Sequence, residues 1–199
     1  MLKVEEVTKS FKEIMVLKKV SLEASRGEMI HISGANGSGK STLFKLITGL
    51  LSPDSGHVQI DDGDVIGALI ENPGFLEFET AFTNMRFLAN LNRKFDRTYI
   101  SELMKNFNLD INDHRSVSNY SVGMRQKLGI IQAVMEGQNI ILLDEPTRGL
   151  DDDSIHQFVL LMTKLVSKNK TIIIASHDKI AALNYDVNYI LKDGHLSHE

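Results

Sequence analysis

A glycine-rich run near the amino end constrains the fold more than any other stretch of this sequence. Residues 34–41 read GANGSGKS and match the pattern G-x-x-x-x-G-K-[ST]. The run follows a predicted strand, residues 29–33, and opens a predicted helix at about 40–48. Small residues at such a junction let backbone N–H groups surround phosphate oxygens. A flexible turn is the less favoured interpretation, because the lysine and the context both fit a phosphate-binding loop.

The loop predicts a set of nucleotide-binding residues. Lys40 would reach the β- and γ-phosphate oxygens, and the Ser41 hydroxyl would help to hold Mg²⁺. The predicted nucleotide-binding residues of this segment are Gly34, Asn36, Gly37, Ser38, Gly39, Lys40, Ser41 and Thr42.

The rest of the chain alternates short apolar runs with helical patterns. Strands are predicted at 2–7, 15–22, 57–60, 65–70, 140–143 and 171–175, helices at 121–135, 152–168 and 178–184, and a closing hairpin at 193–194. This order predicts an α/β fold, a P-loop NTPase whose mostly parallel sheet is covered by helices. The β-like runs at the start predict an N-terminal antiparallel part.

A helical block interrupts this alternation. Between residues 73 and 119 the apolar residues recur at helical spacing, as in Phe82, Met85 and Leu88. A chain of 199 residues, 42% of them hydrophobic, is long enough for one substantial core. We therefore predict one domain over residues 1–199, with a helical subdomain at about 72–135 inserted into the nucleotide-binding core.

Polar side chains follow two of the predicted strands. Asp144 and Glu145 come directly after 140–143, and His177 comes shortly after 171–175. An acidic pair alone is more often a cap or a turn, but beside a phosphate loop it indicates a nucleotide site. Asp144 suits a metal ion, Glu145 suits the polarisation of an attacking water, and His177 could donate to a γ-phosphate.

A second helix start also suits an anion. Residues 120–127 read YSVGMRQK, in which Ser121 can cap the following helix. Free N–H groups, the helix dipole and the nearby Arg125 and Lys127 would suit a phosphate. From the pattern alone, a plain capped helix remains the simpler interpretation.

Composition excludes several classes of protein. The net charge is −4 and the Lys and Arg residues form no long block, which argues against nucleic acid as a partner. The absence of cysteine excludes disulfides and thiolate metal sites. No apolar leader and no run of eighteen apolar residues is visible, so we expect a soluble protein that is not exported and does not itself span a membrane.

The order of these motifs resembles the ATP-binding subunits of ABC transporters over essentially the whole chain. The segments that carry the resemblance are the phosphate loop, Ile70-Glu71-Asn72 as a Q-loop, YSVGM as the signature, 144–147 as the strand end, Gly149-Leu150-Asp151 as the D-loop and Ser176-His177-Asp178 as the switch histidine. Together, ALIENPGF and YSVGMRQKLGI resemble the bacitracin-type branch, which exports antimicrobial peptides.

The resemblance implies an ATPase that uses ATP and Mg²⁺ and powers a separate transmembrane permease, as an exporter. Two such subunits, here two copies of one chain, would close head to tail around ATP, at the inner face of the cell membrane. The implied roles are catalysis by Glu145, His177 and Lys40, adenine stacking by Phe11, contact in trans by Ser121 and Gly123, a D-loop contact by Asp151, and Mg²⁺ coordination by Ser41, Glu71 and Asp144.

The sequence departs from the family pattern in two motifs. Glu71 replaces the usual glutamine, and Val122 and Met124 replace a glycine and the glutamine of LSGGQ.

Two alternative functions remain open. One is a soluble ABC assembly scaffold, and a weaker one is a P-loop kinase, for which no arginine-rich lid is visible. A GTPase is disfavoured, since Asn169-Lys170 is not followed by the x-Asp of a guanine site.

Overall fold

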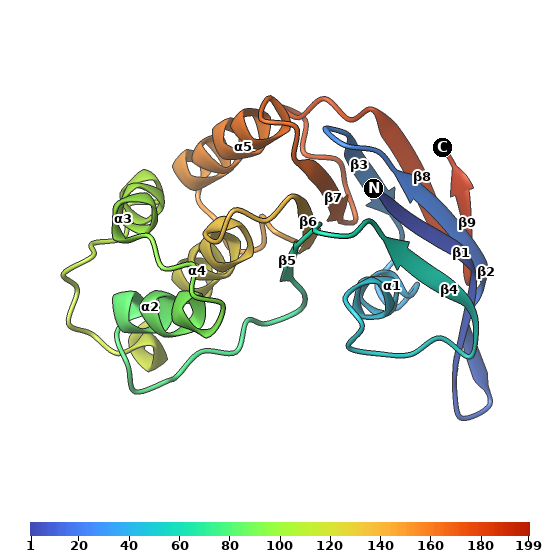
Figure 1. Cartoon of the computed structure of the whole chain (residues 1–199), viewed down its shortest axis with the longest axis horizontal. Coiled ribbons are helices and arrows are strands. Elements are labelled where there is room, and N and C mark those ends of the chain that lie inside the picture. Colours follow the sequence, from blue (N-terminus) through green and yellow to red (C-terminus); the bar gives the residue numbers. More distant parts are fainter.

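A computed structural model describes all residues, 1–199, as two sheets and five α-helices (Figure 1). The smaller sheet is antiparallel, in the order β2-β1-β4, and the larger has the order β5-β6-β7-β3-β8-β9, with only β9 antiparallel. The strands are β1 (Leu2–Phe11), β2 (Ile14–Ala24), β3 (Met29–Ser33), β4 (Ser55–Ile60), β5 (Ile66–Leu69), β6 (Ile140–Asp144), β7 (Thr171–Ala175), β8 (Val187–Lys192) and β9 (His195–His198). The helices are α1 (Lys40–Ile47), α2 (Ala81–Leu91), α3 (Arg97–Asn106), the 3₁₀ turn η1 (Val117–Asn119), α4 (Val122–Val134) and α5 (Asp152–Val166).

The larger sheet is buried on both faces, as its uninterrupted apolar strands predict. In β6, Ile140 and Leu142 belong to one hydrophobic core, whereas Ile141 and Leu143 belong to the other. Because successive side chains of a strand point to opposite faces, one strand supplies both cores. The predicted fold class, with its mostly parallel sheet and its antiparallel amino-terminal part, is confirmed.

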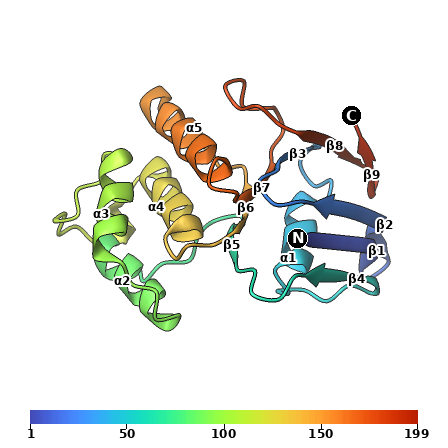
Figure 2. The same ribbon diagram turned by 45° about the horizontal axis from the view of Figure 1, so that its top comes forward.

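The two cores define the layers of the molecule. Helix α1 lies between the two sheets, where Leu43 and Phe44 are completely buried. Helices α4 and α5 cover the opposite face of the larger sheet, and α2 and α3 pack against α4, farthest from the antiparallel sheet (Figures 1 and 2). No helix combines the length and the apolar character that crossing a bilayer requires.

Tight turns close the two hairpins. In the closing hairpin, Asp193 and Gly194 both have positive φ, 51° and 83°, as the turn between two directly paired strands requires. The first hairpin is longer than predicted: β1 and β2 pair as far as Phe11 and Ile14, around a turn in which Lys12 has φ 55°.

The helix predicted at 178–184 does not form. Residues 176–186, which we call the switch loop, run from β7 to β8 without regular structure. Only one turn closes there, from the Leu183 N–H to the Ile180 carbonyl. The Ser176 hydroxyl binds the Asp178 carbonyl, and the Tyr185 hydroxyl accepts from the Ile180 N–H. The Ser176 hydroxyl therefore occupies the Asp178 carbonyl, a group that a helix over 178–184 would use.

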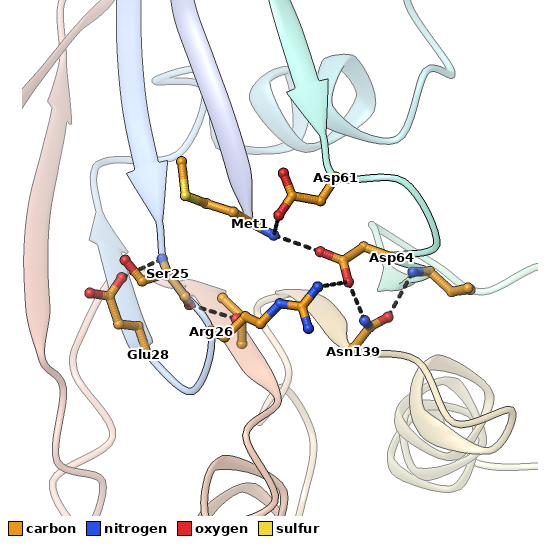
Figure 3. A network of polar contacts seen from close by, with 9 residues as sticks. Met1, Ser25, Arg26, Glu28, Asp61, Asp64 and Asn139 are labelled. Carbon is orange, nitrogen blue, oxygen red and sulfur yellow. Dashed lines mark hydrogen bonds and ion pairs between the residues drawn. The ribbon is translucent and has the colours of Figure 1, made fainter.

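A buried carboxylate ties the antiparallel sheet to the larger one (Figure 3). The Asp64 side chain is 3% exposed and pairs with the Met1 amine at 2.6 Å and with Arg26 at 3.1 Å. Asn139, just before β6, also donates to Asp64 and accepts from the Val65 N–H at 2.7 Å. The hydrogen bond from the Met1 amine is the main cause that lowers the pKa of Asp64, and the Arg26 charge adds to it, against the effect of burial.

We predict that Asp64→Asn lowers the free energy of unfolding by about 1–3 kcal/mol, because two cations lose their buried partner. Since the folded-state pKa lies below the unfolded value of about 3.9, the carboxylate stabilises the fold above that pH, and this contribution disappears as pH falls through the folded pKa. Urea unfolding of variant and parent should therefore differ at neutral pH and converge in acid. Asp61→Asn is the control: Asp61 is half exposed and contacts only the amine. An effect of Asp64→Asn no larger than that of the control would contradict the prediction.

Candidate functional site

A cavity of about 570 Å³ opens at the carboxyl edge of the larger sheet. The loop between β3 and α1 forms much of its wall. The predicted site residues that line the cavity are Phe11, Asn36, Gly37, Ser38, Gly39, Lys40, Ser41, Thr42, Glu71, Asp144 and Glu145. Those that do not line it are Gly34, Ser121, Gly123, Asp151 and His177. The structure therefore brings most of the predicted residues together.

The phosphate loop packs tightly against β2. Gly39 is the N-cap of α1 with φ 108°, and a Cβ there would lie 3.0 Å from the Leu17 side chain and 3.1 Å from the Val16 side chain. Only glycine fits both the backbone and the space. The next residue, Lys40, is buried, and its Nζ donates to the carbonyls of Gly34 at 2.5 Å and Ala35 at 3.3 Å. The loop thus holds a cation against its own backbone.

Ser41 and Asp144 offer adjacent oxygen ligands. The Ser41 hydroxyl donates to Asp144 Oδ2 at 2.5 Å, although the two residues come from α1 and the end of β6. Burial raises the pKa of Asp144, against the opposing effects of the Ser41 hydrogen bond and the Lys40 charge. No group of three His, Cys, Asp or Glu side chains surrounds this point. One hydroxyl and one carboxylate fit Mg²⁺, which keeps waters and takes phosphate oxygens as further ligands.

Glu145 presents a free carboxylate oxygen to the cavity. Its φ is 47°, its N–H donates to the Ala175 carbonyl at 2.8 Å, and its carbonyl accepts from Gln126 Nε2 at 2.9 Å. Oε1 is buried without a hydrogen-bond partner and lies 3.8 Å from Lys40 Nζ. The backbone is therefore fixed at both polar groups, while a carboxylate oxygen remains able to accept a proton.

Glu71 approaches the same point from the end of β5. Its φ is 56°, and its backbone N–H acts to lower the pKa of Asp144, against the effect of burial. Its own carboxylate pairs with Lys45 of α1 at 2.7 Å. The acidic side chain that replaces the family glutamine is thus balanced by a lysine.

The basic residues near the start of α4 pair with carboxylates. Ser121 caps the helix and accepts from the Met124 N–H at 3.2 Å. Arg125, however, makes a two-pronged ion pair with Glu77, and Lys127 lies 3.5 Å from Asp151. Carboxylates from distant segments therefore already pair with Arg125 and Lys127, and a phosphate contact by either side chain stays a prediction.

The D-loop packs against the signature. A Cβ on Gly123 would lie 2.3 Å from the Gly149 carbonyl oxygen, so glycine is required for close approach of the two backbones. Asp151 caps α5 and accepts from the N–H and the hydroxyl of Ser154 at 2.8 and 2.6 Å. Val122, between the cap and this contact, is 61% exposed and lines the cavity.

Two predicted contacts lie at the margin of the site. Phe11 ends β1 at the cavity, is 43% exposed, and has Lys9 Nζ 5.8 Å from its ring centroid. His177 follows β7 at the carboxyl edge, but its side chain is 68% exposed, and Nδ1 lies 3.2 Å from the Asp178 carboxylate. The structure therefore brings Phe11 to the cavity and leaves His177 outside it.

Sequence reasoning did not predict five residues that line the cavity: Val16, Asn72, Val122, Gln126 and Arg148. Gln126 lies within YSVGMRQK, and Arg148 directly precedes the D-loop, so both stood inside or beside segments already singled out. Their proximity to the motifs is the signal that could have found them. Arg148 adds a second positive charge to a cavity that contains Lys40 and three carboxylates.

Comparisons with known proteins agree with this geometry. Residues 17–148 match the family described as ABC transporter. The chain is 36% identical to the ABC transporter ATP-binding protein YdbJ of Bacillus subtilis (strain 168), over 79% of this chain and 54% of that protein. It is 30% identical to the bacitracin transport ATP-binding protein BcrA of Enterococcus faecalis, over 98% of this chain and 67% of that protein. The chain thus spans about half the length of the first relative and two thirds of the second.

A solved structure matches the whole chain. It is the dimeric post-hydrolysis state of the ATP-binding cassette MJ0796 bound to ADP and Pi, with TM-score 0.88 and 29% identity, covering 100% of this chain and 98% of that one. The resemblance to ABC ATP-binding subunits, including the bacitracin type, is confirmed. The chain belongs to the ABC transporter family, whose ATP-binding subunits hydrolyse ATP to power transport.

Proposed function

We propose that this chain hydrolyses Mg²⁺-bound ATP at the described cavity and thereby powers export by a separate transmembrane permease. The observation that carries the proposal is the Ser41–Asp144 oxygen pair beside the free Glu145 carboxylate. The likeness to a bacitracin transport protein supports an antimicrobial peptide as the exported compound. The subunit would sit on the inner face of the cell membrane, held there by its permease.

The proposed roles follow from where the side chains lie. Lys40 neutralises phosphate charge, and Ser41 and Asp144 hold Mg²⁺, which supplies further charge neutralisation when bound. Glu71 contributes a further oxygen to the metal shell. Glu145 accepts a proton from the attacking water. The phosphate-loop residues Gly34, Asn36, Gly37, Ser38, Gly39 and Thr42 bind phosphates, Phe11 stacks on adenine, and His177 contacts the γ-phosphate once the switch loop moves toward the nucleotide.

The active form is proposed to be a homodimer. Ser121 and Gly123 of one copy face ATP held by the other, and Asp151 lies at the junction. Exposure of the helix start beside Val122 supports this arrangement, as does the dimeric state of the matched cassette. A two-fold pairing would form the same contact twice.

We propose that residues 1–199 form one ABC-type domain whose helical subdomain, about 72–135, transmits the nucleotide state. The segment 72–119 would dock the permease. Its support is a group of exposed apolar side chains around α2, in which Phe78 is 92% exposed and Leu91 is 65% exposed. Large apolar side chains exposed on one helical block are typical of a surface that contacts another protein.

We predict that Phe78→Asp abolishes co-purification of the permease from detergent-solubilised membranes and leaves basal ATP hydrolysis within about two-fold of the parent, because the change desolvates a charge only in the complex. Leu50→Asp is the matched control, since Leu50 is 70% exposed outside the helical block. Mass spectrometry would identify what is captured. Unchanged capture by Phe78→Asp and by Leu91→Asp would contradict the docking surface, and capture of soluble proteins alone would favour the scaffold alternative.

A further inference from the structure

His31 is a fully buried histidine in the strand that leads into the phosphate loop. Its neighbours Ile30 and Ile32 point into the core around α1, so His31 points to the opposite face of the sheet. There it is paired in register with Ile174 of β7. Its Nε2 lies 2.9 Å from the hydroxyl of Ser176, the first residue of the switch loop.

The hydrogen-bond pattern fixes where the ring carries its proton. The Ser176 hydroxyl has one proton and donates it to the Asp178 carbonyl at 2.7 Å. The same oxygen must therefore accept from His31, so Nε2 carries the hydrogen and Nδ1 of the neutral ring does not. Burial lowers the pKa of His31, and Lys179 adds to the lowering, which keeps the ring neutral at pH 7.

A histidine at position 31 stabilises the fold less than an apolar residue would. Nδ1 is buried and has no hydrogen-bond partner. A buried polar atom without a partner destabilises a fold, whereas an apolar side chain of similar size would not. If the ring served only to fill the core, leucine would serve better. The bond to Ser176 is what the imidazole adds.

The ring also contacts the far end of the switch loop. Its centroid lies 5.0 Å from the ring of Tyr185, whose hydroxyl accepts from the Ile180 N–H at 3.4 Å. One side chain of β3 thus touches both ends of a loop that has a single turn of its own. His177 lies directly beside the first of these contacts.

We propose that His31 is a positioning residue: its neutral Nε2–H holds Ser176 and so sets where the adjacent His177 is presented. The contact links the strand that enters the phosphate loop to the loop that carries the switch histidine. The inference rests on the role of His177 given under the proposed function.

The test compares His31→Leu, His31→Gln and His31→Asn. Glutamine can place a donor near the position of Nε2, whereas asparagine is too short. For His31→Leu we expect a free energy of unfolding equal to or above that of the parent and faster amide hydrogen exchange over 177–186. The kcat should fall about tenfold, with KM for ATP within about two-fold of the parent.

The other variants test whether a donor at this position is what matters. His31→Gln should show parental loop protection and turnover, whereas His31→Asn should show neither. Ser176→Ala, which also removes the bond to the Asp178 carbonyl, should impair the loop at least as much as His31→Leu, and the double variant should be no worse than Ser176→Ala.

Unchanged exchange over 177–186 in His31→Leu would overturn the inference, and so would a parallel loss of stability and activity in all three variants. Faster exchange with full turnover would also overturn it, provided that His177→Ala abolishes hydrolysis. If His177→Ala itself keeps parental turnover, the proposed role of His177 fails, and the exchange data then show separately whether His31 holds the loop.

Discussion

Glu145→Gln reduces the rate of ATP hydrolysis by about 10²–10⁴-fold, the range expected when a general base is lost. The introduced amide would keep the shape of the side chain, and the backbone bonds to Ala175 and Gln126 do not depend on the carboxylate. The cavity also contains the carboxylates of Glu71 and Asp144. Because one negative charge is removed beside the phosphates, ATP should bind as tightly as in the parent or more tightly.

Steady-state hydrolysis and the affinity for ATP, measured by calorimetry on the same preparations, check this result. Glu23→Gln is the control, since Glu23 is an exposed carboxylate on β2 that does not line the cavity. A Glu145→Gln enzyme that turns over within a few-fold of the parent, with intact ATP affinity, would remove Glu145 from the chemical step.

Asn36→Cys and Val122→Cys, prepared as separate single variants, form a covalent mixed dimer in ATP and not without it. The chain has no cysteine, so each variant has one thiol. Both positions are exposed, and neither change removes the Ser121 cap of α4. A linker of about 10 Å between the thiols should join one chain's phosphate loop to the other chain's signature, since two-fold pairing repeats each contact.

Glu145→Gln is added to both chains so that ATP persists in the closed pair. Linkage is measured by mass spectrometry of the joined peptides, which identifies the two positions. Asn36→Cys mixed with Glu23→Cys should remain unlinked under the same conditions. Equal linkage with and without ATP, given confirmed ATP binding and thiol reactivity, would show that the signature does not close over a partner's nucleotide.

Local sequence determined the chemistry of the phosphate loop. Gly39 needs a positive φ, which the glycine of the motif supplies locally, whereas its close contact with Val16 and Leu17 comes from packing against β2. Local sequence also placed Asp144 and Glu145, which come after the apolar residues of β6 and so reach the carboxyl edge. The alternation of apolar strands with helices also predicted the layers of the fold, because the spacing of apolar residues within each element shows which of its faces is buried.

Tertiary packing decided which charged side chains have an ion-pair partner. Arg125 and Lys127 looked available for a phosphate, but their partners Glu77 and Asp151 lie 48 and 24 positions away. Lys45 pairs with Glu71, 26 positions away, although nothing in either local segment indicates the pairing. A residue's charge can be read from sequence, whereas its partner depends on how the whole chain packs.

The switch loop shows most clearly what local sequence could not predict. Residues 178–184 have a helical pattern, and local propensity alone favoured a helix. The backbone instead follows bonds from Ser176 and Tyr185, and Ser176 is itself held by His31, 145 positions away. The sequence by itself determined the motifs, the strands and the edge at which they meet, because those depend on hydrogen bonds and sterics within a few residues. Only the folded chain decided the course of this loop and the partners of the charged residues, because those depend on contacts that form when distant segments pack together.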